Sequence, residues 1–161
     1  MEQKHNIAPL YGEDSEILIL GSFPSVMSRQ QKFFYGHPQN RFWRVIAAVY
    51  GADTPNTIEE KRSLILENHL ALWDVISSCE ISGSSDSSIK NVLPNDISII
   101  LKQSSVKKIV VNGKTAEKYY KKYIQPEIGI EAVCLPSTSP ANAMWTLEKL
   151  IKEWKKTLSA D

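Results

Sequence analysis

The sequence predicts an α/β fold with three layers, α/β/α, in which helices cover both faces of a four-stranded parallel sheet. Four short apolar runs have the length expected of strands that are buried on both faces. Between these runs lie segments whose apolar residues recur at helical spacing. Strands that alternate with helices along a chain usually pair in parallel, because each helix carries the chain back to the start of the next strand.

The four predicted strands consist mainly of Ile, Leu, Val and Ala residues. They cover residues 16–20, 69–76, 107–111 and 131–135. The apolar part of the first strand, residues 17–20, is the longest apolar run near the N-terminus. It is far too short to cross a membrane.

Helical spacing of apolar residues predicts five helices. They cover about residues 40–50, 58–67, 97–101, 116–123 and 140–158. The last helix is expected to start at Ser139 and Pro140, because serine is a good N-cap and proline fits the first helical position. Its buried face is expected to carry residues at intervals of three and four, namely Met144, Leu147, Ile151, Trp154 and Leu158.

Length and composition are those of one soluble domain. The 161 residues suit a single domain covering residues 1–161. The first eight residues are polar and lack the apolar core of a signal peptide, so we expect a cytoplasmic protein without membrane contact. The net charge of +1 does not by itself indicate a nucleic-acid partner. No long exposed apolar pattern is evident, which favours a monomer.

The two cysteines, Cys79 and Cys134, do not form a close pair. Zinc and iron–sulfur sites need clustered ligands, so we expect two buried, reduced thiols and no metal. The sequence likewise indicates no organic cofactor.

Four segments that follow the predicted strands are rich in Gly, Ser, Thr, Asn or Pro. They are residues 21–28, 77–88, 112–115 and 136–142. In parallel sheets ligands bind beyond the carboxyl ends of the strands, so we expect a site where these segments meet.

The residue types alone leave several roles open at this site. Asn40 could cap the helix that follows it, which is a common role for asparagine. Asn112 could offer a donor and an acceptor to a base edge, or could fix its own turn. Ser139 could cap a helix and also bind a phosphate there.

Two strings of residues resemble known motifs. Residues 21–25 (Gly-Ser-Phe-Pro-Ser) with residues 37–43 (His-Pro-Gln-Asn-Arg-Phe-Trp) resemble the first motif of the mismatch-specific uracil-DNA glycosylases. Residues 137–142 (Ser-Thr-Ser-Pro-Ala-Asn) resemble their second motif, a loop that enters DNA. The mismatch enzymes have a catalytic asparagine where this chain has Phe23. With phenylalanine at this position, the chain instead resembles the hypoxanthine-DNA glycosylase (DNA-deoxyinosine glycosylase) branch of the uracil-DNA glycosylase superfamily.

The resemblance covers most of the chain and implies an enzyme of DNA repair. Such an enzyme flips a deaminated base out of DNA and hydrolyses its N-glycosidic bond, leaving an abasic site. Hypoxanthine is the first expected base and uracil the second, and the DNA partner is either double- or single-stranded.

The resemblance also suggests roles for individual residues. In this branch the catalytic residue is the asparagine before Arg-Phe-Trp, here Asn40. An amide is not a strong base, so its expected role is to position the attacking water. Phe23 and Tyr35 are candidates to stack on the base, and Asn112 to bind its edge. The candidates for DNA contact are Ser22, Ser25, His37, Ser137, Ser139 and Asn142. His37 could equally be structural.

Two other functions compete for the same residues. A serine hydrolase could use Ser22 or Ser25 with a histidine, but the chain lacks a Gly-x-Ser-x-Gly motif and has only three histidines. A non-catalytic module that binds nucleotides or nucleic acid could use the same fold, because fold does not determine function.

Overall fold

A four-stranded parallel sheet forms the centre of the molecule, as predicted. The structure is a computed structural model that describes residues 2–159, so Met1, Ala160 and Asp161 of the predicted domain lie outside the described range. The strands lie in the order β3-β2-β6-β7. Their bounds are β2 (Ile17–Gly21), β3 (Leu70–Asp74), β6 (Lys108–Asn112) and β7 (Ala132–Leu135).

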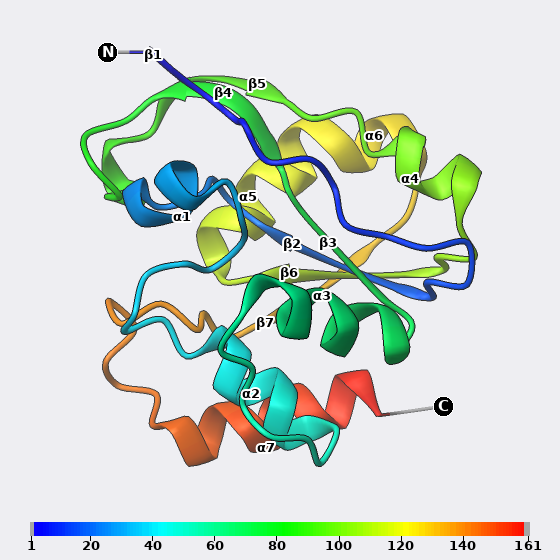
Figure 1. Ribbon diagram of the computed structural model, residues 1–161. Coiled ribbons are helices and arrows are strands. Elements are labelled where there is room, and N and C mark those ends of the chain that lie inside the picture. Colours follow the sequence, from blue (N-terminus) through cyan, green and yellow to red (C-terminus); the bar gives the residue numbers. More distant parts are fainter. Residues whose placement is uncertain (1, 160–161) are drawn as a thin grey trace.

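Helices cover both faces of this sheet, which confirms the three-layer arrangement (Figure 1). One face carries α2 (Phe42–Val49), α3 (Ile58–Glu67) and α7 (Leu147–Leu158). The other carries α4 (Ser98–Gln103), α5 (Lys114–Tyr119), a π-helical segment (Tyr120–Ile124) and α6 (Gln125–Ile128). A short helix, α1 (Val26–Gln31), follows β2. No helix within residues 2–159 is both long enough and apolar enough to cross a membrane.

A second sheet, which the sequence did not predict, lies at the top of Figure 1, on the same side of the parallel sheet as α5. It is antiparallel and contains β1 (Glu2–Lys4), β4 (Ile76–Glu80) and β5 (Lys90–Pro94) in the order β1-β4-β5. The predicted strand at residues 69–76 therefore ends early, at Asp74. Val75 donates its backbone N–H to the carbonyl of Gly21 at 2.8 Å, and beyond it the chain enters the second sheet. Because residues 69–76 form one apolar run, the sequence does not indicate that the chain passes from one sheet to the other within it.

The C-terminal helix begins later than predicted. Helix α7 starts at Leu147, and Thr146 is its N-cap. Ser139 accepts a hydrogen bond from Ala141 N at 3.1 Å, so it closes a short turn and does not start the helix. Met144, expected on the buried face, is 90% exposed. The reason is that several carbonyls of residues 138–145, which a helix would use internally, instead accept hydrogen bonds from Arg41.

Core packing fixes the loops at the carboxyl edge of the sheet. Trp154 of α7 is fully buried, and its indole N–H donates to the carbonyl of Pro136 at 3.0 Å. Gly113, directly after β6, has a φ of 95°, and a Cβ there would lie 2.9 Å from the Cβ of Ser137. The turn after β6 and the loop after β7 therefore touch, which requires glycine at this position.

The cysteines are both free. Cys79 is buried as predicted, whereas Cys134 is only half-buried. Burial raises the pKa of both thiols.

Candidate active site

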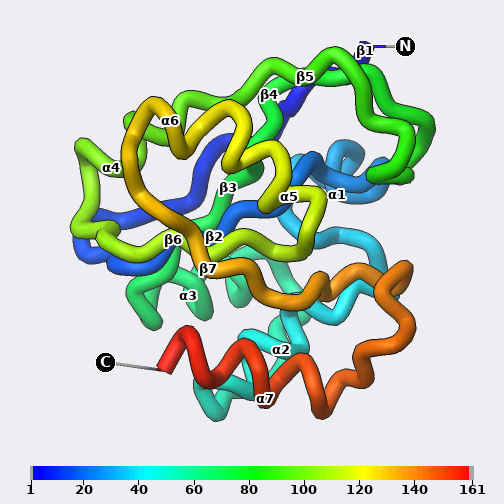
Figure 2. The backbone as a smooth tube through the Cα atoms, turned by 180° about the vertical axis from the view of Figure 1, so that it is seen from behind, coloured from blue at the N-terminus to red at the C-terminus, as the bar shows by residue number. Residues whose placement is uncertain are grey.

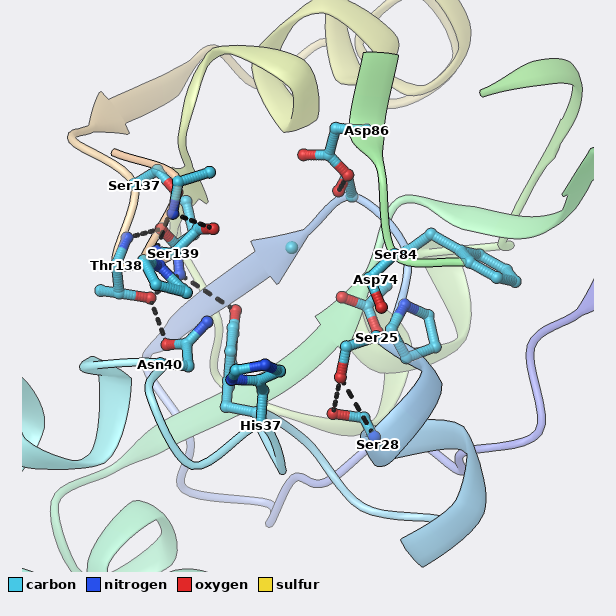
Figure 3. A pocket seen from close by; sticks show the side chains of 18 of the residues that line it. Ser25, Ser28, His37, Asn40, Asp74, Ser84, Asp86, Ser137, Thr138 and Ser139 are labelled. Carbon is cyan, nitrogen blue, oxygen red and sulfur yellow. Dashed lines mark hydrogen bonds between the residues drawn. The ribbon is translucent and has the colours of Figure 1, made fainter. Parts of the chain in front are cut away.

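A cavity of about 480 Å³ opens at the carboxyl edge of the parallel sheet, where the sequence predicts a site (Figure 3). This volume lies within the range of roughly 300–1,000 Å³ that is typical of ligand pockets. All the predicted site residues except Asn142 line it, and they come from segments far apart in the chain. They are Ser22, Phe23, Ser25, Tyr35, His37, Asn40, Asn112, Ser137 and Ser139.

The amide of Asn40 is held in one orientation. Its Oδ1 accepts a hydrogen bond from the backbone N–H of Phe42 at 2.9 Å, at the start of α2. The same oxygen accepts a second bond from the hydroxyl of Thr138 at 2.8 Å. Figure 3 shows the amide nitrogen directed into the cavity. Asn40 thus satisfies a helix terminus with its oxygen and presents a donor to the cavity with its nitrogen.

Thr138, which was not a predicted site residue, connects two of the three predicted asparagines, Asn40 and Asn112. It is fully buried. Its hydroxyl accepts from Asn112 Nδ2 at 3.1 Å while donating to Asn40. Its backbone N–H donates to Asn112 Oδ1 at 3.1 Å. The only sequence signal was its position between two serines of the second motif.

Asn112 therefore has partners within the protein at both ends of its amide. In addition to Thr138, its Nδ2 donates to the hydroxyl of Tyr35 at 3.3 Å. Both protons of Nδ2 are therefore used within the protein, whereas Oδ1 accepts one bond and has a second lone pair that a donor on a base edge could use. The contact of Asn112 with a base stays a prediction, and its observed bonds favour a part in holding the cavity wall.

The two predicted stacking residues differ in how they are held. Tyr35 adopts a positive φ of 51°, and its ring stacks on Phe42 with centroids 3.9 Å apart. Burial, together with the nearby carboxylate of Asp74, raises the pKa of Tyr35 far above its usual value, so its hydroxyl is neutral. Phe23 is 8% exposed, and the guanidinium of Arg29 lies 5.3 Å from its ring centroid.

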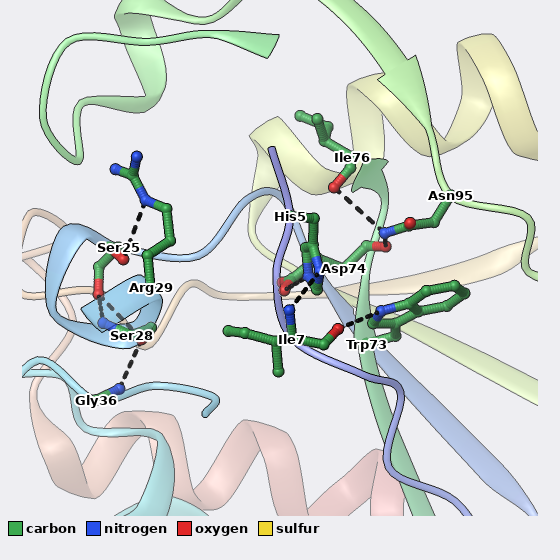
Figure 4. A network of polar contacts seen from close by, with 10 residues as sticks. All are labelled: His5, Ile7, Ser25, Ser28, Arg29, Gly36, Trp73, Asp74, Ile76 and Asn95. Carbon is green, nitrogen blue, oxygen red and sulfur yellow. Dashed lines mark hydrogen bonds and ion pairs between the residues drawn. The ribbon is translucent and has the colours of Figure 1, made fainter. Parts of the chain in front are cut away.

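Two carboxylates in the cavity wall, Asp74 and Asp86, lie in segments that resemble the family but were not predicted as site residues. Asp74 ends β3, and its side chain is almost fully buried against His5, whose Nε2 lies 2.8 Å from Asp74 Oδ2 (Figure 4). His5 Nδ1 accepts from the N–H of Ile7, so its proton lies on Nε2 and it donates to Asp74 as a neutral ring. Asp86 is the second carboxylate and accepts from the hydroxyl of Ser22 at 3.1 Å.

The remaining predicted residues mostly stabilise the loops. Ser25 caps α1, accepting from Ser28 N at 3.1 Å, and Ser28 in turn accepts from Gly36 N at 2.8 Å (Figure 4). His37 is half-exposed at the cavity, and its Nδ1 accepts from Gln39 N at 3.1 Å. Neither Ser22 nor Ser25 hydrogen-bonds to a histidine among the residues described, so the serine-hydrolase hypothesis lacks its catalytic pair.

Arg41 organises the loop after β7, which runs beside residues 36–41 in both views of the backbone (Figures 1 and 2). Its guanidinium donates to the carbonyls of Ser139 at 2.9 Å and Asn142 at 3.1 Å, and also to that of Trp145. Asn142 donates its side chain to the carbonyl of Ser137 at 3.0 Å. Asn142 therefore helps fold the loop and does not line the cavity.

No group of three His, Cys, Asp or Glu side chains suited to a metal ion occurs within the described part of the chain. The site offers amides, hydroxyls, aromatic rings and two carboxylates. This set can hold a flat heteroaromatic ring and orient a water molecule beside it.

Comparisons with known proteins match nearly the whole chain. The family profile of the uracil DNA glycosylase superfamily matches residues 8–159. The chain is 34% identical over 142 residues to a "Hypoxanthine DNA glycosylase" of Methanosarcina barkeri, covering 87% of this chain and 89% of that protein. It is 33% identical over 154 residues to a protein of the same name from Methanosarcina acetivorans, covering 94% and 96%.

A solved structure also matches this fold. It is an NMR structure of a Methanosarcina acetivorans protein that was provisionally named a uracil DNA glycosylase. The TM-score is 0.83 at 32% identity, covering 98% of this chain and 97% of that one.

Proposed function

This chain belongs to the uracil DNA glycosylase superfamily and is a DNA glycosylase, and from this premise we propose that it removes hypoxanthine from deoxyinosine in DNA. The observation that carries the proposal is the fixed amide of Asn40 in a cavity at the carboxyl edge of the sheet. The names of the two Methanosarcina relatives support hypoxanthine as the base. The family assignment also favours an enzyme over a non-catalytic binding module.

The proposed reaction starts with a deoxyinosine that is flipped out of the DNA into the cavity. Asn40 Nδ2 donates to the oxygen of a water molecule, which leaves a lone pair of that oxygen free to attack C1′. As the bond to the base breaks, positive charge develops on the sugar. The carboxylate of Asp74, whose partner His5 is neutral, and the DNA phosphates stabilise this charge.

The substrate preference gives a first prediction. Hypoxanthine is expected to be released from deoxyinosine in DNA, with uracil released from deoxyuridine more slowly or not at all. The measurement uses matched oligonucleotides, single-stranded and duplex, with one lesion each, and counts abasic sites by cleavage in alkali. An undamaged oligonucleotide is the control. Equal or faster release of uracil from duplex DNA would contradict the proposed base while leaving the family assignment intact.

We propose that Ser22, Ser25, His37, Ser137, Ser139 and Asn142 contact the DNA, as the sequence suggests. The loop after β7 supplies three of them, and the guanidinium of Arg41 donates hydrogen bonds to carbonyls of this loop. Arg41 is therefore a positioning residue for the DNA-binding surface. It acts through the loop and needs no contact with DNA itself.

Replacing Arg41 with methionine tests this role of the loop. Hydrogen bonds to a charged group contribute about 1.5–3 kcal/mol each, so the variant is expected to melt at a lower temperature. Its affinity for lesion DNA is expected to fall on the order of tenfold, which corresponds to about 1.4 kcal/mol. The matched control is Arg44→Met, because Arg44 is an exposed arginine in the first turn of α2, directly after Arg41 at the N-cap. Equal affinities in the two variants, measured by fluorescence anisotropy, would show that the loop does not depend on Arg41.

We also propose that the enzyme acts as a monomer in the cytoplasm. The large apolar side chains that are exposed come from different elements, namely Val26, Ile58, Leu93, Ile99, Val133 and Met144. Both cysteines are free, as is usual where cellular thiols are kept reduced.

A further inference from the structure

Asp86 is a carboxylate in the cavity that the mechanism above does not use. It begins the 3₁₀ helix Asp86–Ser88, between β4 and β5. Its carboxyl is reachable from the cavity and is held by the hydroxyl of Ser22 at 3.1 Å. Figure 3 places Asp86 on the opposite side of the cavity from Asn40. A base between them would have the water-binding amide on one side and this carboxyl on the other.

Asp86 is exposed as a whole residue, and the part of its surroundings formed by protein raises the pKa of its carboxyl. Desolvation by the neighbouring protein raises the pKa of Asp86, and the charge of Asp74 raises it further. Hydrogen bonds from the hydroxyls of Ser22 and Thr115 oppose this, but the net shift is upward. The other titratable groups nearby are Cys79 of β4 and Tyr119 of α5. Both are uncharged near neutral pH, since burial raises the pKa of each.

We propose that Asp86 is a catalytic residue that donates its proton to the purine as the base leaves, an inference that rests on the proposed function. A purine departing from C1′ takes the electron pair of the bond at N9. Proton transfer from the Asp86 carboxyl to N7 lets hypoxanthine leave as a neutral molecule. The water oxygen then bonds to C1′, and the proton that the water loses returns to Asp86 through solvent. Uracil has no N7 to accept this proton, so the acid should accelerate the release of purines and not the release of uracil.

The test compares wild type with Asp86→Asn in single-turnover cleavage of deoxyinosine DNA at saturating enzyme, across the pH range. The variant keeps an acceptor for Ser22 but cannot donate as an acid. Its rate is expected to fall about a hundredfold, the lower end of what general acid catalysis contributes. The wild-type rate should decline as pH rises through the raised pKa of Asp86, and the variant should lack that decline. A matched control is Asp96→Asn, because Asp96 is an aspartate outside the cavity lining.

A second measurement changes the substrate and compares wild type with the same variant. DNA containing 7-deaza-2′-deoxyinosine has no N7 to protonate, so wild type should cleave this DNA slowly. The Asp86→Asn variant should cleave it at nearly the same low rate. Asp86 is not the acid if Asp86→Asn retains the wild-type rate and pH profile. It is also not the acid if Asp86→Asn loses the same factor on both substrates. Absence of hypoxanthine release by wild type would instead refute the proposed function itself.

Folding gives an independent readout. A carboxyl with a raised pKa in the folded state makes folding less favourable as pH rises through that value. Asp86→Asn removes this effect, so the variant should melt no lower than wild type at neutral pH. A large drop in its melting temperature would indicate a structural role and overturn the proposal.

Discussion

Replacing Asn40 with alanine is expected to slow single-turnover release of hypoxanthine by on the order of a hundredfold or more. The Asn40 amide is fixed by Phe42 N–H and the Thr138 hydroxyl, so its nitrogen presents one defined donor to the cavity. Without that donor the water is misplaced, and a shift of about 1 Å can cost a hundredfold in rate. Binding of lesion DNA should survive, because the amide acts on water and not on the base.

The structure also predicts a stability cost for this variant, so rate and folding must be measured separately. The N-cap of α2 is Arg41, so Asn40 is not the cap itself, but its loss removes the acceptor of the first helical N–H, that of Phe42, which costs about 1 kcal/mol. Asn40→Asp is the matched control, because a carboxylate oxygen accepts the same two hydrogen bonds from Phe42 N–H and the Thr138 hydroxyl. It should fold like wild type and yet change the cleavage rate strongly, since the donor is lost and a charge is added. Wild-type rates in both variants at saturating enzyme would remove Asn40 from the mechanism.

The parallel sheet could be predicted because its strands are continuous apolar runs. The second sheet could not, since its outer strands carry no such signal. Residues 2–4 read Glu-Gln-Lys, and β5 is mostly exposed, so neither strand shows an apolar pattern. Their pairing with β4 depends on partners distant in the chain. Glu2 lies opposite Glu80, for example.

The same reason explains which parts of the site were missed. Motifs and strand ends identified the loops that line the cavity, because these signals are local in sequence. The contacts between the loops are not local. Thr138 bonds to Asn40 across 98 positions, and His5 bonds to Asp74 across 69. Asp74 belongs to residues 69–76, which the sequence predicts as one buried strand, so it was not predicted as a site residue.

Thr138→Val is expected to slow hypoxanthine release by on the order of tenfold or more, although Thr138 touches neither DNA nor water in the proposed mechanism. Valine keeps the shape of threonine but lacks the hydroxyl. That hydroxyl donates to Asn40 Oδ1 and accepts from Asn112 Nδ2. Without it, the Asn40 amide is free to rotate about its remaining bond to Phe42 N–H. Imprecise placement of the water then lowers the rate of the chemical step.

Thr138→Ser is the matched control, because it restores the hydroxyl while removing only a methyl group. Serine should recover most of the rate even if the missing methyl lowers the melting temperature. Valine should fold well enough to bind lesion DNA, yet cleave it slowly, so the loss should appear in the single-turnover rate and not in affinity. If rates instead follow melting temperatures in both variants, Thr138 merely packs the fold. If Thr138→Val cleaves at the wild-type rate, the bond to Asn40 does not set the position of the water.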